Sequence, residues 1–298
     1  MKEYMDQEKL KIMKENSGFI AALDQSGGST AKTLEKYGIP KDTYSTEEEM
    51  FELIHEMRKR VFTSKVFTND KILGCILFYK TMNSKVGEKY TADYLWEDKK
   101  ILSFLKVDKG LEEEKNGVKL MKDIPDLLDQ LELARERNIF GTKMRSVILK
   151  ANREGIREIV KQQFDFAKII CENGLVPIIE PEVDINIPDK KEAEEILKEE
   201  IDKVLQEWNK DDLIMFKFTI PTIANLYEDF YQYESVVRIV ALSGGYETDK
   251  ACELLKQNHR MIASFSRALL QSLSANQTEE EFNKELKNAI DEIYEASI

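Results

Sequence analysis

The sequence predicts an α/β protein folded as a single (β/α)8 TIM barrel, and two observations support this. Short apolar segments alternate along the chain with longer segments whose apolar residues recur at helical spacing, which is typical of a parallel sheet covered by helices. The alternation occurs eight times within 298 residues, a length at which eight strand–helix units form one closed barrel. We therefore expect one domain over residues 1–298, with an extra N-terminal helix and an extra C-terminal helix.

The eight predicted strands are short apolar runs, most of which end in charged or turn-forming residues. A segment with helical periodicity separates each strand from the next, as expected of parallel strands joined by crossover helices. The strands are expected at residues 18–24, 71–79, 103–108, 140–147, 175–182, 213–219, 236–243 and 261–266.

The predicted helices carry signals of where they begin and end. Ser45 and Thr46 precede Glu48 and Glu49, a capping-box pattern, and Gly174 is expected to stop the helix whose apolar face includes residues 156–171. We expect residues 82–100 to form a long loop or an insertion. Further helices are expected over about residues 5–15, from Pro125 to about Asn138, along an apolar stripe from Ala193 to Trp208, and from a cap at Thr278 and Glu281 through Ile293.

Composition and charge exclude several classes of function. The formal net charge of −12 makes nonspecific binding to nucleic acid or to an anionic membrane unfavourable. The charged N-terminal segment cannot be a secretory signal, and no apolar run is long enough to span a bilayer. Three widely spaced cysteines argue against a disulfide framework and favour the reducing cytoplasm.

Only two histidines, His55 and His259, are present, and they are distant in sequence. The chain therefore has too few imidazole ligands for a metal site that relies on a cluster of histidines. We expect no metal and no cofactor. The sequence leaves the oligomeric state open, a homo-oligomer included.

Lys217 lies within an otherwise apolar strand, between Phe216 and Phe218. A lysine in a buried strand is costly unless it is paired or neutral, whereas a lysine at a strand edge reaches solvent at little cost. A neutral amine in an apolar setting is a nucleophile. An isolated lysine is more often at a strand edge. The other residues of the chain therefore have to distinguish a buried nucleophile from a solvent-exposed edge lysine.

Polar residues recur at the ends of the predicted strands with the strand period of two. Residues i and i+2 share one face of a strand, and in a barrel the C-terminal ends of all strands converge on the face that carries catalytic residues. Each pair alone is weak evidence, but so many strand ends behaving alike favours a functional pocket. The residues are Asp24, Lys106 and Asp108, Lys143 and Arg145, Glu180 and Glu182, Lys217 and Thr219, Ser243 to Gly245, and Ser264 with Arg267.

The residue types indicate imine chemistry on a phosphorylated carbonyl compound. A second cation at Lys143 would favour the neutral amine of Lys217, which can attack a carbonyl to form an imine, an electron sink for breaking a neighbouring carbon–carbon bond. Glu180 and Asp24 are the candidates for proton transfer. Two groups of anion-binding residues flank the lysine and imply a bisphosphate: Ser243, Gly244, Ser264 and Arg267 in one, and Ser26 to Ser29 with Lys106 in the other.

The chain resembles the class I fructose-1,6-bisphosphate aldolases, which are the Schiff-base type, and it closely resembles their bacterial branch. The resemblance covers nearly the whole chain and rests on segments that occur together in this order. They are residues 19–29 (FIAALDQSGGS), 105–110 (LKVDKG), 141–145 (GTKMR), 176–182 (VPIIEPE), 216–217 (FK), 242–245 (LSGG) and 264–269 (SFSRAL).

The resemblance implies reversible cleavage of fructose 1,6-bisphosphate to dihydroxyacetone phosphate and glyceraldehyde 3-phosphate in glycolysis and gluconeogenesis. It makes Lys217 the Schiff-base lysine, Glu180 the acid/base for carbinolamine formation, Asp24 the carboxylate that assists cleavage, and Lys143 the lysine that orients the substrate. It implies substrate and phosphate contacts for Glu182, Arg145, Ser243, Gly244, Ser264, Arg267, Ser26, Ser29 and Lys106.

Two departures from the family and two alternatives stay open. The chain ends at Ile298 without the terminal tyrosine of the animal enzymes, so the group that exchanges the enamine proton is unassigned, and residues 78–81 (FYKT) replace a glutamate-containing sequence. The substrate could be another phosphorylated ketose, such as tagatose 1,6-bisphosphate. The protein could also bind phosphosugars without turnover, although binding alone requires no lysine nucleophile. The scarcity of histidine disfavours a metal-dependent aldolase.

Overall fold

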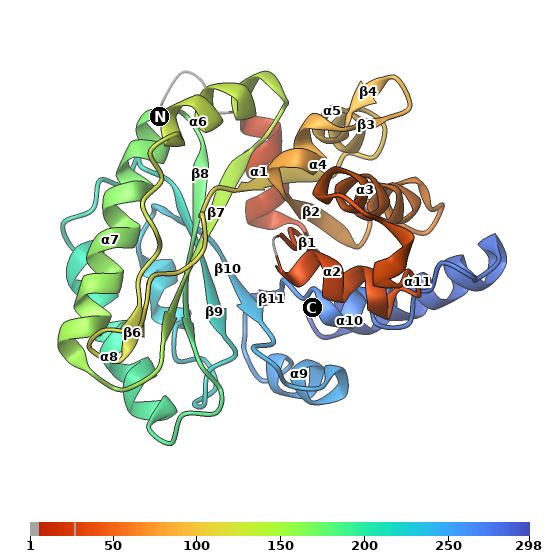
Figure 1. Ribbon diagram of the computed structural model, residues 1–298. Helices are drawn as coiled ribbons and strands as arrows, with labels where there is room; N and C mark the ends of the chain where they lie inside the picture. The colour runs from red at the N-terminus through yellow and green to blue at the C-terminus, as the bar shows by residue number, and fades with distance from the viewer. Residues whose placement is uncertain (1–5, 27) are drawn as a thin grey trace.

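The computed structural model describes residues 6–26 and 28–298 and shows a parallel α/β barrel, as predicted (Figure 1). All eight expected strands form, and each lies within or close to its predicted range. They are β1 (Phe19–Leu23), β2 (Ile72–Leu77), β5 (Leu102–Lys106), β7 (Gly141–Ile148), β8 (Val176–Val183), β9 (Ile214–Thr219), β10 (Val236–Leu242) and β11 (Met261–Ala263).

The barrel strands are ordered as they occur in the chain, and each pairs in parallel with the next. A backbone hydrogen bond of 3.4 Å from Ala22 N to the carbonyl of Phe265 connects β1 to the segment after β11, so the two ends of the sheet meet and the barrel is nearly closed. A short strand, β6 (Val118–Lys119), is added antiparallel to the end of β7.

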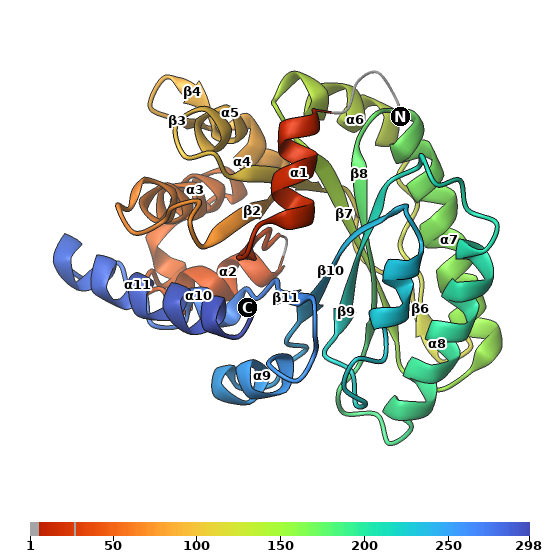
Figure 2. The same cartoon turned by 180° about the vertical axis from the view of Figure 1, so that it is seen from behind.

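Helices surround the strands on the outside (Figures 1 and 2). The two predicted capping boxes are confirmed at Thr46 with Glu49 and at Thr278 with Glu281, and Gly174 ends its helix with a positive φ of 79°. The helices are α1 (Gln7–Glu15), α2 (Gly28–Lys36), α3 (Glu47–Thr63), α4 (Tyr79–Asn83), α5 (Thr91–Glu97), α6 (Leu127–Glu136), α7 (Arg153–Glu172), α8 (Lys190–Leu205), α9 (Thr248–Leu255), α10 (Arg267–Leu270) and α11 (Glu279–Glu295).

Residues 82–100 were expected to form a long loop or an insertion, and the long loop was wrong. This stretch contains the end of α4, a two-stranded hairpin of β3 (Lys85–Val86) and β4 (Lys89–Tyr90), and α5. Gly87, with φ of 64°, makes the turn, and Ala92 and Leu95 of α5 are fully buried. The segment therefore forms local structure that buries its few apolar residues against the barrel.

Three of the predicted helices have limits that shift by a few residues. The helix α6 begins at Leu127, two residues after Pro125, and ends at Glu136 rather than Asn138. The helix α8 ends at Leu205, so Trp208 follows the helix, where its ring meets Phe164 edge-on. The N-terminal helix begins at Gln7 with Asp6 as its cap, and residue 5 lies outside the described residues. Such shifts are ordinary at frayed helix ends.

An apolar layer fills the inside of the barrel and is closed at one end by α1. Ile20, Phe104, Ile178 and Met215 belong to this inner cluster, together with Met13 of α1. Figure 2 shows α1 beside β2 and β10, which it contacts. The layer lies toward the N-terminal ends of the strands and so leaves their C-terminal ends for polar side chains.

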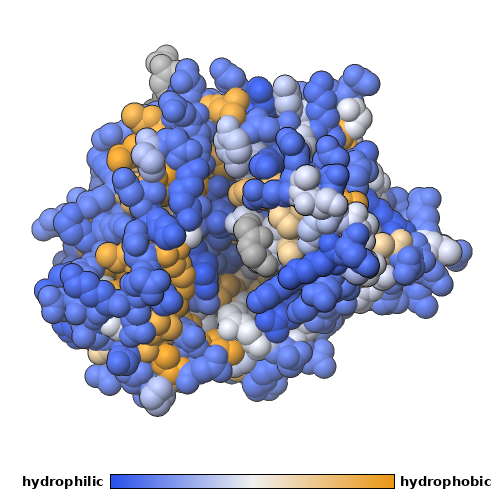
Figure 3. Space-filling model, viewed as in Figure 1, coloured by the Kyte–Doolittle hydropathy of each residue, from blue (hydrophilic) through white to orange (hydrophobic). Residues whose placement is uncertain are grey.

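The face seen in Figure 1 is largely hydrophilic, as Figure 3 shows, in keeping with a chain in which 34% of residues are charged. Across the described residues, none of the helices is both long enough and apolar enough to cross a bilayer.

Candidate active site

The candidate catalytic side chains lie one strand period beyond the inner apolar layer. Asp24 follows Ala22 by two residues, Glu180 follows Ile178, and Lys217 follows Met215, and the apolar partners all belong to the inner cluster. Because side chains two residues apart share a face, these charged groups are also directed into the barrel. They lie at the C-terminal ends of the strands, the catalytic face of this fold.

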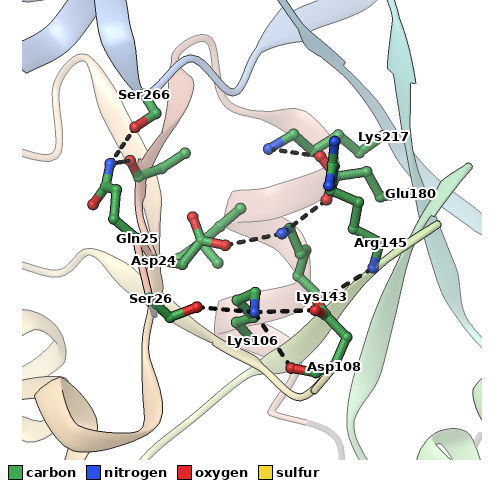
Figure 4. Close-up of polar contacts among 12 residues, drawn as sticks. Asp24, Gln25, Ser26, Lys106, Asp108, Lys143, Arg145, Glu180, Lys217 and Ser266 are labelled. Carbon is green, nitrogen blue, oxygen red and sulfur yellow. Dashed lines mark hydrogen bonds and ion pairs between the residues drawn. The ribbon is translucent and has the colours of Figure 1, made fainter. Parts of the chain in front are cut away.

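Lys143 of β7 is at the centre of a buried ion-pair cluster. Its Nζ lies 2.9 Å from Oδ2 of Asp24 and 2.9 Å from Oε2 of Glu180. Lys217 approaches the same glutamate, with its Nζ 3.3 Å from Oε1 (Figure 4). Lys143, Glu180 and Lys217 are each 4% exposed or less. The alternative of a lysine that reaches solvent at a strand edge is thereby excluded for Lys217.

Burial and ion pairing oppose each other at this cluster. Burial alone would raise the pKa of Asp24, but the charges of Lys143 and Lys217 outweigh it and hold that pKa well below its usual range. Burial would lower the pKa of Lys143, but Asp24 and Glu180 raise it overall. Lys143 is therefore an ammonium and Asp24 a carboxylate at neutral pH. The neutral form of the Lys217 amine stays a prediction.

A cavity of about 870 Å³ opens above the cluster. It is lined by all four candidate catalytic residues and by Glu182, and it extends to the ends of β10 and β11. The buried Oγ of Ser264 has no hydrogen-bond partner within the described residues, so this hydroxyl is available to a ligand. The predicted anion-binding residues on this wall are Ser243, Gly244, Ser264 and Arg267.

A second pocket, of about 290 Å³, adjoins the first. Lys106 is central to it, with its Nζ 3.1 Å from the hydroxyl of Ser26 and 3.0 Å from Oδ1 of Asp108. Asp24, Ser29 and two further side chains line both cavities, so one ligand could reach from one into the other. Of the predicted segment 26–29, residue 27 lies outside the described residues.

Arg145 and Glu182 form an ion pair at the rim. Nε of Arg145 lies 2.5 Å from Oε2 of Glu182, and this hydrogen bond raises the pKa of the guanidinium although burial opposes it. Glu182 lines the larger cavity and Arg145 the smaller one. The structure thus brings together all thirteen predicted site residues and divides them between two joined pockets.

Sequence reasoning missed three residues that support the site. Arg58 of α3 is fully buried, and its Nη2 donates to the carbonyl of Gln25 at 2.7 Å and to Oε1 of Gln25 at 3.2 Å. Burial lowers the pKa of Arg58 to about 10. The amide of Gln25 in turn donates to Ser266 Oγ across the β1–β11 seam (Figure 4). Gln25 follows Asp24 directly, a position that could have suggested it, whereas nothing in the sequence singles out Arg58.

A buried lysine–carboxylate cluster at the C-terminal mouth of a TIM barrel is the arrangement of a barrel enzyme, because catalytic residues collect at that face. Residues 5–219 match the profile of the family described as class I fructose-bisphosphate aldolase, which is more than half of the chain. The protein belongs to the class I fructose-bisphosphate aldolase family, and this membership supports a lyase.

Solved structures with low sequence identity share the fold. Fructose-bisphosphate aldolase from Plasmodium falciparum, in a ternary complex with TRAP and a small-molecule inhibitor, aligns with a TM-score of 0.75 at 19% identity, over 99% of this chain and 96% of that one. The Corynebacterium glutamicum protein Cgl0159 aligns with a TM-score of 0.52 at 11% identity, over 99% and 88% of the two chains. These likenesses support the barrel architecture.

Proposed function

We propose that the protein cleaves fructose 1,6-bisphosphate reversibly to dihydroxyacetone phosphate and glyceraldehyde 3-phosphate through an imine on Lys217. The observation that carries the proposal is the placement of Lys217: it is buried, faces Glu180 at 3.3 Å, and lines a cavity that joins a second pocket containing Lys106 and Arg145. A lysine so placed can attack a carbonyl while a carboxylate exchanges protons beside it.

The proposed reaction begins at the C2 ketone of the open-chain sugar. The Lys217 nitrogen adds to C2, and Glu180 transfers the protons that convert the carbinolamine to a protonated imine with loss of water. Asp24 then accepts the proton of the C4 hydroxyl as the C3–C4 bond breaks, and the bonding electrons move into the imine to give an enamine. Glyceraldehyde 3-phosphate leaves, and protonation at C3 followed by addition of water releases dihydroxyacetone phosphate and the lysine.

Lys143 is suited to hold the two carboxylates in place during these steps. Its ammonium contacts Asp24 and Glu180 at the same distance of 2.9 Å, so it fixes both proton-transfer groups on one side of the cavity. It also supplies a fixed positive charge where the substrate oxygens become negative. We therefore assign Lys143 to orientation and charge stabilisation, and Lys217 to bond formation.

The two pockets suit the two phosphates of an extended ketose bisphosphate. We assign the C1 phosphate to Ser243, Gly244, Ser264 and Arg267 in the larger cavity. Gly244 has a φ of 62°, and a Cβ there would lie 2.9 Å from Ile185 Cγ2, so glycine is required at this turn. We assign the C6 phosphate to Ser26, Ser29 and Lys106 in the smaller pocket, with Arg145 at its edge. Phosphorylated sugars in the cytoplasm are thus the proposed ligands.

The test is to trap the imine. Incubation with dihydroxyacetone phosphate and borohydride should attach the three-carbon unit to Lys217, as located by peptide mass spectrometry, and Lys217→Met should abolish both labelling and turnover. Lys9 is a matched control, because burial lowers its pKa but it lies at the opposite end of the barrel beside Asn138. Labelling of Lys9 in place of Lys217 would reject the proposal.

Two further arms of the experiment address the cofactor and the substrate. Because the proposed chemistry uses an amine, activity should be unchanged after dialysis against a chelator, and a loss restored by divalent metal would contradict the mechanism. Comparison of kcat/KM for fructose and tagatose 1,6-bisphosphates would establish which epimer at C4 is preferred.

A further inference from the structure

The backbone pairing between β8 and β9 stops immediately before the catalytic residues. The two strands pair at Ile178 with Met215 and at Ile179 with Phe216, and the ladder extends no further. Each strand nevertheless continues to pair with its other neighbour, β8 with β7 as far as Val183 and β9 with β10 as far as Thr219. The strands therefore separate from one another where Glu180 and Lys217 face the cavity.

The side chain of Thr219 bridges this gap. Its hydroxyl donates to the carbonyl of Val183 at 2.7 Å and accepts from the N–H of Val183 at 3.0 Å, so one side chain satisfies both backbone groups of a residue on the opposite strand. Thr219 is 1% exposed, so both hydrogen bonds are shielded from solvent. The bridge is two residues after Lys217 and three residues after Glu180.

Thr219 also contacts the proposed phosphate wall. A Cβ built on Gly244 would lie 3.3 Å from the Cγ2 methyl of Thr219, which shows how closely the methyl approaches this turn. The hydroxyl thus fixes β8 relative to β9, while the methyl lies against a residue assigned to the C1 phosphate.

We propose that Thr219 is a positioning residue that sets the spacing and orientation of Glu180 relative to the Lys217 amine. The inference rests on the proposed function, since it concerns proton transfer during imine formation. Without a backbone ladder at this point, the hydroxyl is the side-chain connection to the β8 backbone that opposes sliding or spreading of the two strands. Catalysis is sensitive to such displacements, because a shift of about 1 Å at reacting groups costs on the order of 100-fold in rate.

The experiment compares Thr219→Val, which keeps the shape and loses the hydroxyl, with Thr219→Ser, which keeps the hydroxyl. The matched control is Thr142→Val on β7, because Thr142 is also fully buried but its hydroxyl has no hydrogen-bond partner within the described residues. The readouts are the rate of borohydride-trapped imine formation with dihydroxyacetone phosphate, and kcat and KM for cleavage.

Thr219→Val should lower the trapping rate and kcat by about 10- to 100-fold and change KM by less than about 3-fold. The kcat of Thr219→Ser should stay within about 3-fold of the wild-type value, and the kcat of Thr142→Val should be indistinguishable from the wild-type value. A residue that only stabilised the fold would lower the melting temperature without this separation of kcat from KM. If Thr219→Val does not fold, the ratio of kcat for Thr219→Ser over Thr219→Ala decides, with a ratio near one overturning the inference.

The outcomes separate the inference from the function on which it rests. Failure of the wild-type protein to form a trapped imine would reject the proposed function. A wild-type protein that is trapped, together with a Thr219→Val variant trapped at the same rate, would reject the positioning role alone. Equal loss in Thr219→Ser and Thr219→Val would also reject it, because the serine retains the bridging hydroxyl.

Discussion

Replacing the two buried lysines one at a time should separate the requirement for the fold from the requirement for the chemistry. Lys143→Met leaves the buried carboxylates of Asp24 and Glu180 without the ammonium that lies 2.9 Å from each. Removing one partner of a buried ion pair costs about 3–5 kcal/mol, since the remaining charge is desolvated and uncompensated. We expect Lys143→Met to lose this amount of unfolding free energy, and its activity as well.

Lys217→Met should be as inactive but much less destabilised. The ion pair of Lys217 with Glu180 is longer, at 3.3 Å, and this glutamate stays paired with Lys143 after the substitution. Methionine is also similar in length to lysine and apolar, so it fills the buried space in an apolar strand without burying a polar amine. The expected loss of unfolding free energy is therefore about 1 kcal/mol or less.

Urea denaturation followed by the fluorescence of Trp96 and Trp208 measures the difference directly. For a protein of this size the expected loss in Lys143→Met corresponds to a melting temperature lower by roughly 5 to 8 °C, against a shift of about 2 °C or less for Lys217→Met. Equal destabilisation of the two variants would refute the reasoning, because it would mean that Lys143 does not hold the carboxylates together.

Two further predictions concern the phosphate pockets and pH. Lys106→Met should raise KM for the bisphosphate about 10- to 100-fold, the value of a charge-assisted hydrogen bond, and leave KM for a ketose 1-phosphate unchanged. Arg267→Met should raise KM for both substrates. Steady-state kinetics in which the two variants behave alike would contradict the assignment. The pKa of Asp24 is depressed in the folded protein, because Lys143 and Lys217 outweigh the effect of burial. The Asp24 carboxylate therefore stabilises the protein fully above the unfolded pKa of about 3.9, and this stabilisation is lost as pH falls through the folded pKa. Below about pH 4, the free energy of unfolding should therefore decrease less steeply with falling pH in Asp24→Asn than in wild type. Parallel curves of unfolding free energy against pH for the two proteins would exclude the effect.

Local periodicity in the sequence determined much of the fold and of the candidate site. Apolar runs alternating with helical stripes predicted eight strands, and all eight are present. The period of two predicted that Lys217 and Thr219, or Glu180 and Glu182, would share a face, because the direction of successive side chains depends only on the backbone of one strand. The same rule predicted that the charged residues collect at the mouth of the barrel.

The tertiary structure alone decided which of these residues meet. It placed Lys143 between Asp24 and Glu180, and it brought Arg58 from a distant helix into hydrogen-bond contact with Gln25. It also divided the site into two joined pockets, and it ended the β8–β9 ladder where the catalytic residues begin. The physical reason is that the direction of a side chain depends on its own strand, whereas the contacts between strands depend on their register, which is fixed only when the whole barrel closes.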